Sequence, residues 1–129
     1  MTYIVKNSWN TAKKQFYNNH QYDSGFESAY ARELDFRKKA KEIISWQPHV
    51  PIDLIVNGYR VCTYTIDFVV HYPDGITEYV ETKGRPTYDW RLKWKLFEAL
   101  YSKHPDTRLV VVQQHSNWRI PKVKKKSAK

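Results

Sequence analysis

Two turn signals in the middle of the chain constrain its folding more than any other feature. Asn57-Gly58 separates two runs rich in β-branched and aromatic residues, 52–56 and 59–72. Asn-Gly favours a two-residue hairpin because both positions of its turn need a positive φ. Pro73-Asp74-Gly75 makes a second turn before residues 76–83. The sequence therefore predicts three consecutive antiparallel strands.

Helical patterns lie on either side of these strands. Apolar residues recur at helical spacing over residues 24–44, and Pro48 and Pro51 are expected to end that segment. A second helix should begin with Asp89 as its cap. Its aromatic stripe consists of Trp90, Trp94, Phe97 and Tyr101. An apolar strand over 109–112 follows, so the prediction is an α/β fold with a mixed central sheet flanked by helices.

The chain of 129 residues is long enough for one compact domain. We expect that domain over residues 23–118. Residues 1–22 are polar and without a clear period, so they are predicted to be a basic, polar arm that is poorly ordered or ordered only on binding. Residues 119–129 are predicted to be a solvated basic tail.

The formal net charge is +9, from 22 Lys and Arg against 13 Asp and Glu. Such an excess favours a polyanionic partner, with DNA as the first candidate, although a basic surface without a specific partner is the alternative. Cys62 is the single cysteine, which excludes an intramolecular disulfide. No apolar run approaches the ~20 residues of a membrane span. We expect a cytoplasmic protein that does not bind membranes.

The strand pattern brings acidic and basic side chains together. Alternation places Ile66, Phe68 and Val70 on one face of their strand and Asp67 on the other. Residues two apart share a face, so Glu81 and Lys83 should lie together on the neighbouring strand. Carboxylates suit Mg²⁺, and a lysine beside them suits phosphodiester hydrolysis. The alternative is an ordinary exposed cross-strand ion cluster.

The order of these elements resembles the PD-(D/E)XK nuclease superfamily over residues 23–114. Five motifs look more narrowly like small bacteriophage nucleases, which are related to Holliday-junction resolvases and to the transposon-end endonuclease subunit. These motifs are Asp23-Ser24-Gly25-Phe26-Glu27-Ser28-Ala29, Gln47-Pro48, Thr65-Ile66-Asp67-Phe68, Val80-Glu81-Thr82-Lys83-Gly84 and Lys95-Leu96-Phe97-Glu98-Ala99. The chain departs from the superfamily in having Ile66 where its name has proline.

This resemblance implies roles for individual residues. Asp67 and Glu81 would be metal ligands, Lys83 the catalytic lysine, and Glu27 a further acidic ligand from the first helix. Ser24-x-x-Glu27 also fits a capping box, and the two roles of Glu27 are compatible. Gln47 would bind substrate at the edge of the site, or would be an amide satisfied by the backbone.

Other residues are excluded from the catalytic site or are assigned to the basic surface. Asp53 stands in a similar context to Asp67 but lies one strand further from Glu81. The five histidines lack ligand spacing, and none is predicted to bind metal. The aromatic stripe is expected to be core rather than a base-stacking platform. Phosphate-binding candidates, with a solvated helix face or a solubility tail as the alternative, are Arg85, Arg91, Lys95, Lys122, Lys124, Lys125 and Lys126.

These observations predict an endodeoxyribonuclease dependent on Mg²⁺, with Mn²⁺ as a substitute and no small-molecule cofactor. The resemblance favours branched DNA, including the four-way junction, in phage recombination, replication or packaging; flaps, forks and linear duplex stay open. A symmetric cut in two strands would require a homodimer. The alternatives are a non-catalytic basic DNA-binding protein and a site-specific restriction-type endonuclease.

Overall fold

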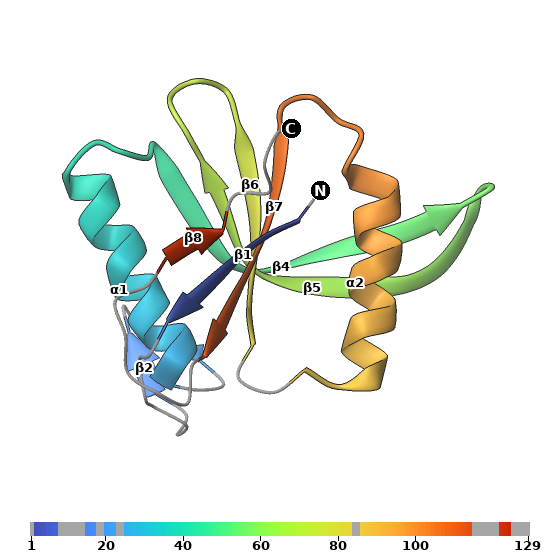
Figure 1. Cartoon of the computed structure of the whole chain (residues 1–129), viewed down its shortest axis with the longest axis horizontal. Coiled ribbons are helices and arrows are strands. Elements are labelled where there is room, and N and C mark those ends of the chain that lie inside the picture. The colour runs from blue at the N-terminus through green and yellow to red at the C-terminus, as the bar shows by residue number, and fades with distance from the viewer. Residues whose placement is uncertain are drawn as a thin grey trace.

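The computed structural model describes residues 2–7, 15–17, 20–22, 25–83, 86–114 and 122–124. Its centre is a six-stranded mixed sheet (Figure 1). In spatial order the strands are β4 (Ser45–Val56), β5 (Tyr59–His71), β6 (Thr77–Lys83), β7 (Thr107–Gln114), β1 (Thr2–Asn7) and β8 (Lys122–Lys124). The helices are α1 (Gly25–Lys39) and α2 (Tyr88–Tyr101), and a separate hairpin is formed by β2 (Gln15–Tyr17) and β3 (His20–Tyr22). The predicted α/β class with a mixed sheet and flanking helices is confirmed.

The predicted three-stranded meander is present as β4, β5 and β6. Asn57 and Gly58 turn between β4 and β5 with φ of 51° and 82°, as this hairpin requires. Gly75, with φ of 92°, turns between β5 and β6. The α2 helix then crosses over to β7, which pairs parallel with β6.

The strand β4 begins earlier than the sequence suggested. It starts at Ser45 and runs through Pro48 and Pro51, which were wrongly expected to separate the first helix from a strand at 52–56. Proline is tolerated there because β4 is the outermost strand beside β5 and its free edge needs no partner for hydrogen bonding.

Residues 1–22 were predicted to be an arm that is poorly ordered or ordered only on binding, but Thr2–Asn7 is part of the sheet. This segment is β1, which pairs parallel with β7, and its Tyr3 and Val5 pack against a buried core. The predicted tail is likewise wrong at Lys122–Lys124, where β8 pairs with β1. Lysine is a residue that edge strands of sheets commonly carry.

Each helix differs from its prediction at one end. The α1 helix ends at Lys39 rather than 44, because Lys41 adopts φ of 64° in a Schellman motif. In that motif the Glu42 N–H donates to the Arg37 carbonyl at 2.9 Å. The N-cap of α2 is Thr87 and not Asp89, since the Thr87 hydroxyl accepts a hydrogen bond from the Trp90 N–H at 3.2 Å.

Two hydrophobic cores cover opposite faces of the sheet, one under each helix (Figure 1). Alternate residues of β7 divide between them: Val110 and Val112 face α1, whereas Leu109 and Val111 face α2. The predicted core role of the aromatic stripe is confirmed, with its central members Trp94 and Phe97 buried. No helix in the described part of the chain is long and apolar enough to cross a membrane.

Candidate active site

The candidate site lies at a fork between two strands. Hydrogen-bonded pairing of β5 with β6 stops at Phe68 and Val80, while β6 continues beside β7 as far as Lys83. Asp67 occupies the fork. Its Oδ2 accepts hydrogen bonds from the Thr82 N–H at 2.8 Å and the Thr82 hydroxyl at 2.7 Å. The carboxylate therefore replaces the missing strand partner of Thr82 and is held in one orientation.

The strand β5 changes faces at Asp67. Phe68 and Val70 belong to the core under α1, but Ile66 belongs to the core under α2, so the predicted common face for these three residues is wrong. The partner strand is irregular at the same level. His49 has φ of 50° and lies between the paired positions Pro48–Phe68 and Val50–Ile66.

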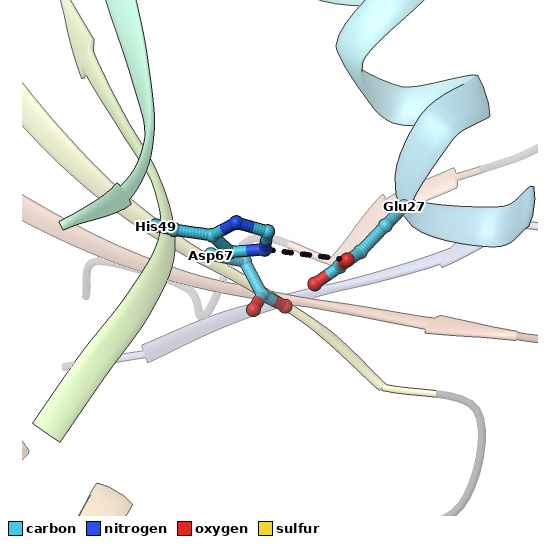
Figure 2. Close-up of side chains that lie close together, drawn as sticks. All are labelled: Glu27, His49 and Asp67. Atoms are coloured by element: carbon cyan, nitrogen blue, oxygen red, sulfur yellow. Dashed lines mark ion pairs between the residues drawn. The ribbon is translucent and has the colours of Figure 1, made fainter. Parts of the chain in front are cut away.

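This bend brings three potential ligands together (Figure 2). Glu27 enters from the first turn of α1, His49 from β4 and Asp67 from β5. The His49 Nε2 is 3.5 Å from the Glu27 Oε1, and one ligand atom from each of the three side chains lies within 4.8 Å of the others. The predicted convergence of Glu27 on Asp67 is therefore observed, and His49 is a residue that the sequence reasoning missed.

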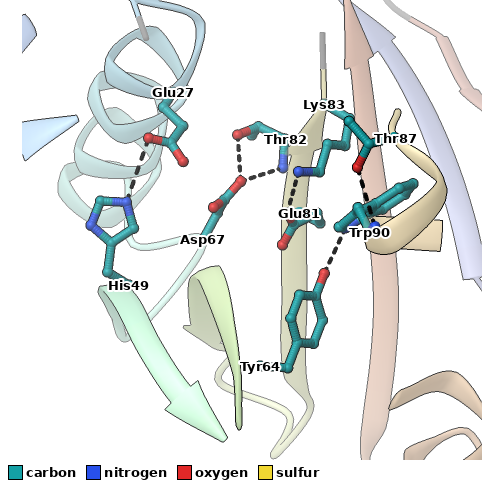
Figure 3. Close-up of polar contacts among 9 residues, drawn as sticks. All are labelled: Glu27, His49, Tyr64, Asp67, Glu81, Thr82, Lys83, Thr87 and Trp90. Carbon is teal, nitrogen blue, oxygen red and sulfur yellow. Dashed lines mark hydrogen bonds and ion pairs between the residues drawn. The ribbon is translucent and has the colours of Figure 1, made fainter. Parts of the chain in front are cut away.

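The other half of the site lies on the side of α2 (Figure 3). The Lys83 Nζ is 3.2 Å from the Glu81 Oε2 and 5.1 Å from the ring centroid of Trp90. The Trp90 indole N–H in turn donates to the Tyr64 hydroxyl at 2.7 Å. The amine thus lies between a carboxylate and an aromatic face, and both contacts restrict its position.

The electrostatics of the site favour a cation. Burial raises the pKa of Asp67 well above its usual range, and the carboxylates of Glu81 and Glu27 raise it further. Burial also raises the pKa of Glu81, against the opposing effect of the Lys83 ammonium. Glu81 is 3 % exposed, and its Oε1 has no hydrogen-bond partner among the described residues. Three buried carboxylates, one of them paired with Lys83, form an oxygen-rich donor set that fits a divalent ion.

The remaining predicted site residues do not belong to this ligand cluster or lie outside the described ranges. Arg91 and Lys95 are exposed on α2, and Gln47 is exposed on β4. Lys122 and Lys124 belong to β8, at the edge of the sheet opposite β4. Arg85, Lys125 and Lys126 are outside the described residues.

Asp53 is correctly excluded from the site. It is exposed on β4, and its carboxylate accepts a hydrogen bond from the Thr63 hydroxyl at 2.7 Å. That pair lies towards the Asn57-Gly58 end of the hairpin, away from the bend at Asp67.

Fold and site together define an α/β protein with a buried carboxylate cluster at a fork in its mixed sheet. The chain belongs to the family described as "Protein of unknown function (DUF1064)", which matches residues 7–117. No curated protein and no solved structure matches it significantly.

Proposed function

We propose that this protein is a metal-dependent endodeoxyribonuclease with its active site at Asp67, Glu81, Lys83 and Glu27. The observation that carries the proposal is the group of three buried carboxylates with a single restrained lysine at its margin. Burial and the repulsion of the neighbouring carboxylates raise the pKa of Asp67, and a divalent cation would relieve that repulsion. The order of helix, antiparallel meander, helix and parallel strand also supports the likeness to the PD-(D/E)XK nuclease core.

Asp67, Glu81 and Glu27 would hold the ion. When bound, Mg²⁺ or Mn²⁺ supplies a water of lowered pKa and polarises the scissile phosphate. Asp67 is kept in place by its two hydrogen bonds from Thr82, so it presents its other oxygen to the centre of the site. One oxygen of Glu81 contacts the Lys83 ammonium, and the other oxygen would be left for the ion.

Lys83 is the group best placed to act on the attacking water or on the phosphate. Its amine approaches Glu81 from one side and the Trp90 ring from another, and the side chain retains 25 % of its exposure. The ammonium is therefore restrained and still accessible to a phosphate oxygen. In that position it would orient the attacking water and stabilise the charge that develops on the phosphate.

The substrate proposed is DNA, in agreement with the net charge of +9. Arg91 and Lys95 on the exposed side of α2 are candidates for phosphate contacts beside Lys83. Branched DNA, including the four-way junction, is the preferred class, and a two-fold dimer would supply the two sites that a symmetric cut requires. A cytoplasmic location belongs to the same proposal.

The test is cleavage of labelled four-way junction, flap and linear duplex DNA in Mg²⁺, Mn²⁺ or EDTA. Wild type is compared with Lys83→Ala and with Lys103→Ala, which removes an exposed lysine beyond the end of α2. We expect cleavage only with metal, a loss of about 100- to 1,000-fold in Lys83→Ala, and normal activity in Lys103→Ala. DNA binding without cleavage by any of the three proteins would overturn the proposal in favour of a non-catalytic DNA-binding protein.

A further inference from the structure

We infer that His49 is a nitrogen ligand of the metal ion, and that it makes the site select Mn²⁺ over Mg²⁺. The inference rests on the metal site of the proposed function and does not depend on the reaction catalysed there. His49 lies on the edge strand β4, and its imidazole is close to two carboxylates, Glu27 from α1 and Asp67 from β5.

The ligand atoms are close enough to share one ion. Atoms bound to one ion at about 2.1 Å lie about 3.0 to 4.2 Å apart. The 3.5 Å between the His49 Nε2 and the Glu27 Oε1 falls inside that range. The full set with Asp67 lies within 4.8 Å, so small side-chain rotations would bring all three atoms onto one centre. Figure 2 shows the imidazole edge directed towards the Glu27 carboxylate, with Asp67 beside both.

The backbone at His49 favours this role over that of a surface histidine. A positive φ is uncommon for a residue other than glycine inside a strand, and it persists where surrounding structure holds it. The pairs Pro48–Phe68 and Val50–Ile66 hold it from both sides, and the local bend accompanies an inward imidazole.

A second observation points to a cation near Asp67. The Glu81 side chain is 4 % exposed, yet its Oε1 has no hydrogen-bond partner among the residues described. It belongs to the strand next to Asp67 and adds to the negative charge that Asp67 experiences. A buried carboxylate oxygen without a donor is costly unless a cation satisfies it.

The nitrogen has a consequence for the choice of metal. Mg²⁺ is a hard ion that takes oxygen ligands and keeps several waters, so a site of carboxylates alone accepts it readily. Carboxylates suit Mn²⁺ as they suit Mg²⁺, but Mn²⁺ is a first-row transition metal and accepts an imidazole nitrogen more readily than Mg²⁺ does. His49 therefore adds affinity for Mn²⁺ that it does not add for Mg²⁺.

The test measures metal binding directly. Mn²⁺ is added to the full chain without DNA, and pulsed electron paramagnetic resonance detects nitrogen coupled to the metal in unlabelled and ¹⁵N-histidine protein. Mn²⁺ and Mg²⁺ affinities are measured by calorimetry for wild type, His49→Asn, His49→Gln and the control His71→Asn. His71 is also a half-buried strand histidine, but it lies beside Thr77.

We expect a histidine nitrogen signal in wild type and His71→Asn that both His49 variants lose. Mn²⁺ affinity should fall by about 10- to 100-fold in those variants, and Mg²⁺ affinity much less. The ¹⁵N experiment needs no substitution, so misfolding of a variant cannot hide the answer. A wild-type spectrum without histidine nitrogen, or equal losses for both ions, would overturn the inference.

The two proposals fail separately. If Mn²⁺ is coordinated by the histidine nitrogen but the protein cuts no DNA, His49 is supported as a ligand and the nuclease proposal is ruled out. Metal-dependent cleavage with no histidine nitrogen on the metal would leave the nuclease and remove the ligand.

Discussion

Strand β6 carries two buried glutamates whose surroundings are opposite in kind. Glu78, which is 6 % exposed, accepts a hydrogen bond from the Arg108 Nε at 2.7 Å and another from the Tyr72 hydroxyl at 3.0 Å. The Arg108 guanidinium also lies 4.6 Å from the centroid of the Tyr72 ring. Both oxygens of Glu78 are thus satisfied, and its charge is neutralised by the protein itself.

Glu81 is buried to a similar degree but is only partly neutralised. One oxygen contacts Lys83, the other has no hydrogen bond within the described ranges, and two further carboxylates, Asp67 and Glu27, lie in the same cluster. A buried ion pair with its hydrogen bonds complete serves structure, whereas an incomplete one lowers stability. The difference agrees with the proposed role of the Asp67–Glu81 end of the fork in metal binding and catalysis, which would be maintained at some cost in stability.

The largest expected contrast is in catalysis. Asp67→Asn should reduce DNA cleavage by about 1,000-fold, because it removes a metal-binding charge at the fork. Glu78→Gln should leave the rate per folded molecule unchanged. Single-turnover cleavage, corrected for the folded fraction, measures both. Equal losses of activity in the two variants would mean that the Asp67–Glu81 site and the Glu78 site do not differ in function.

Stability should show the reverse order. Glu78→Gln should lower the free energy of unfolding by about 2 to 3 kcal/mol, because it leaves the Arg108 charge without its carboxylate. This value is below that for a fully buried pair because the Arg108 side chain is 33 % exposed.

Asp67→Asn in EDTA should instead raise the free energy of unfolding by about 1 kcal/mol, since it removes repulsion and keeps an oxygen for Thr82. Urea denaturation near neutral pH measures the two variants side by side. A stabilised Glu78→Gln protein, or a strongly destabilised Asp67→Asn protein, would refute the comparison.

The stabilising effect of Asp67→Asn should depend on pH. The pKa of Asp67 is raised by burial and by its neighbouring carboxylates, so the folded state binds its proton more tightly than the unfolded state. The wild type should therefore lose stability relative to Asp67→Asn as pH rises above about 4, the ordinary range of an unfolded aspartate. Urea midpoints in EDTA at several pH values from mildly acidic to neutral measure the gap. A gap that narrows with rising pH would contradict this sign.

The smallest effect concerns the support of Lys83. Tyr64→Phe removes the acceptor of the Trp90 indole N–H and should lower stability by about 1 kcal/mol. A less restrained Trp90 ring should slow cleavage several-fold through Lys83. Tyr79→Phe is the matched control, because Tyr79 packs on the same aromatic cluster and contacts Phe97. Equal rates in the two variants would show that the Tyr64–Trp90 contact does not position the lysine.

Much of the site was predictable because local signals determine it. The Pro73-Asp74-Gly75 turn places β5 and β6 side by side, and alternation along β6 puts Glu81 and Lys83 on one face, next to the strand that carries Asp67. His49 was not predictable in this way. A regular two-residue turn at Asn57-Gly58 would set Asp67 opposite Pro48, but the irregularity between Leu54 and Ile55 shifts the register by one residue.

The edges of the sheet were predicted less well for a different reason. Parallel pairing of β1 with β7 joins Thr2 to Leu109, and no local pattern reports a contact between residues so far apart in sequence. The polar composition of residues 1–22 therefore concealed a short strand next to the edge of the sheet. Lysines in β8 concealed an edge strand in the same way.

Because β1 pairs with β7, β1 cannot be paired in the sheet until β7 has been synthesised. β1 leaves the ribosome before β7, because the paired residues Thr2 and Leu109 are separated by roughly a hundred residues of chain. The intervening segment from α1 to β6 is continuous and already contains Glu27, His49, Asp67 and Glu81. The proposed metal ligands are therefore all synthesised while β1 is still an unpaired strand. Aggregation of nascent chains should accordingly begin at β1, in the interval before β7 emerges.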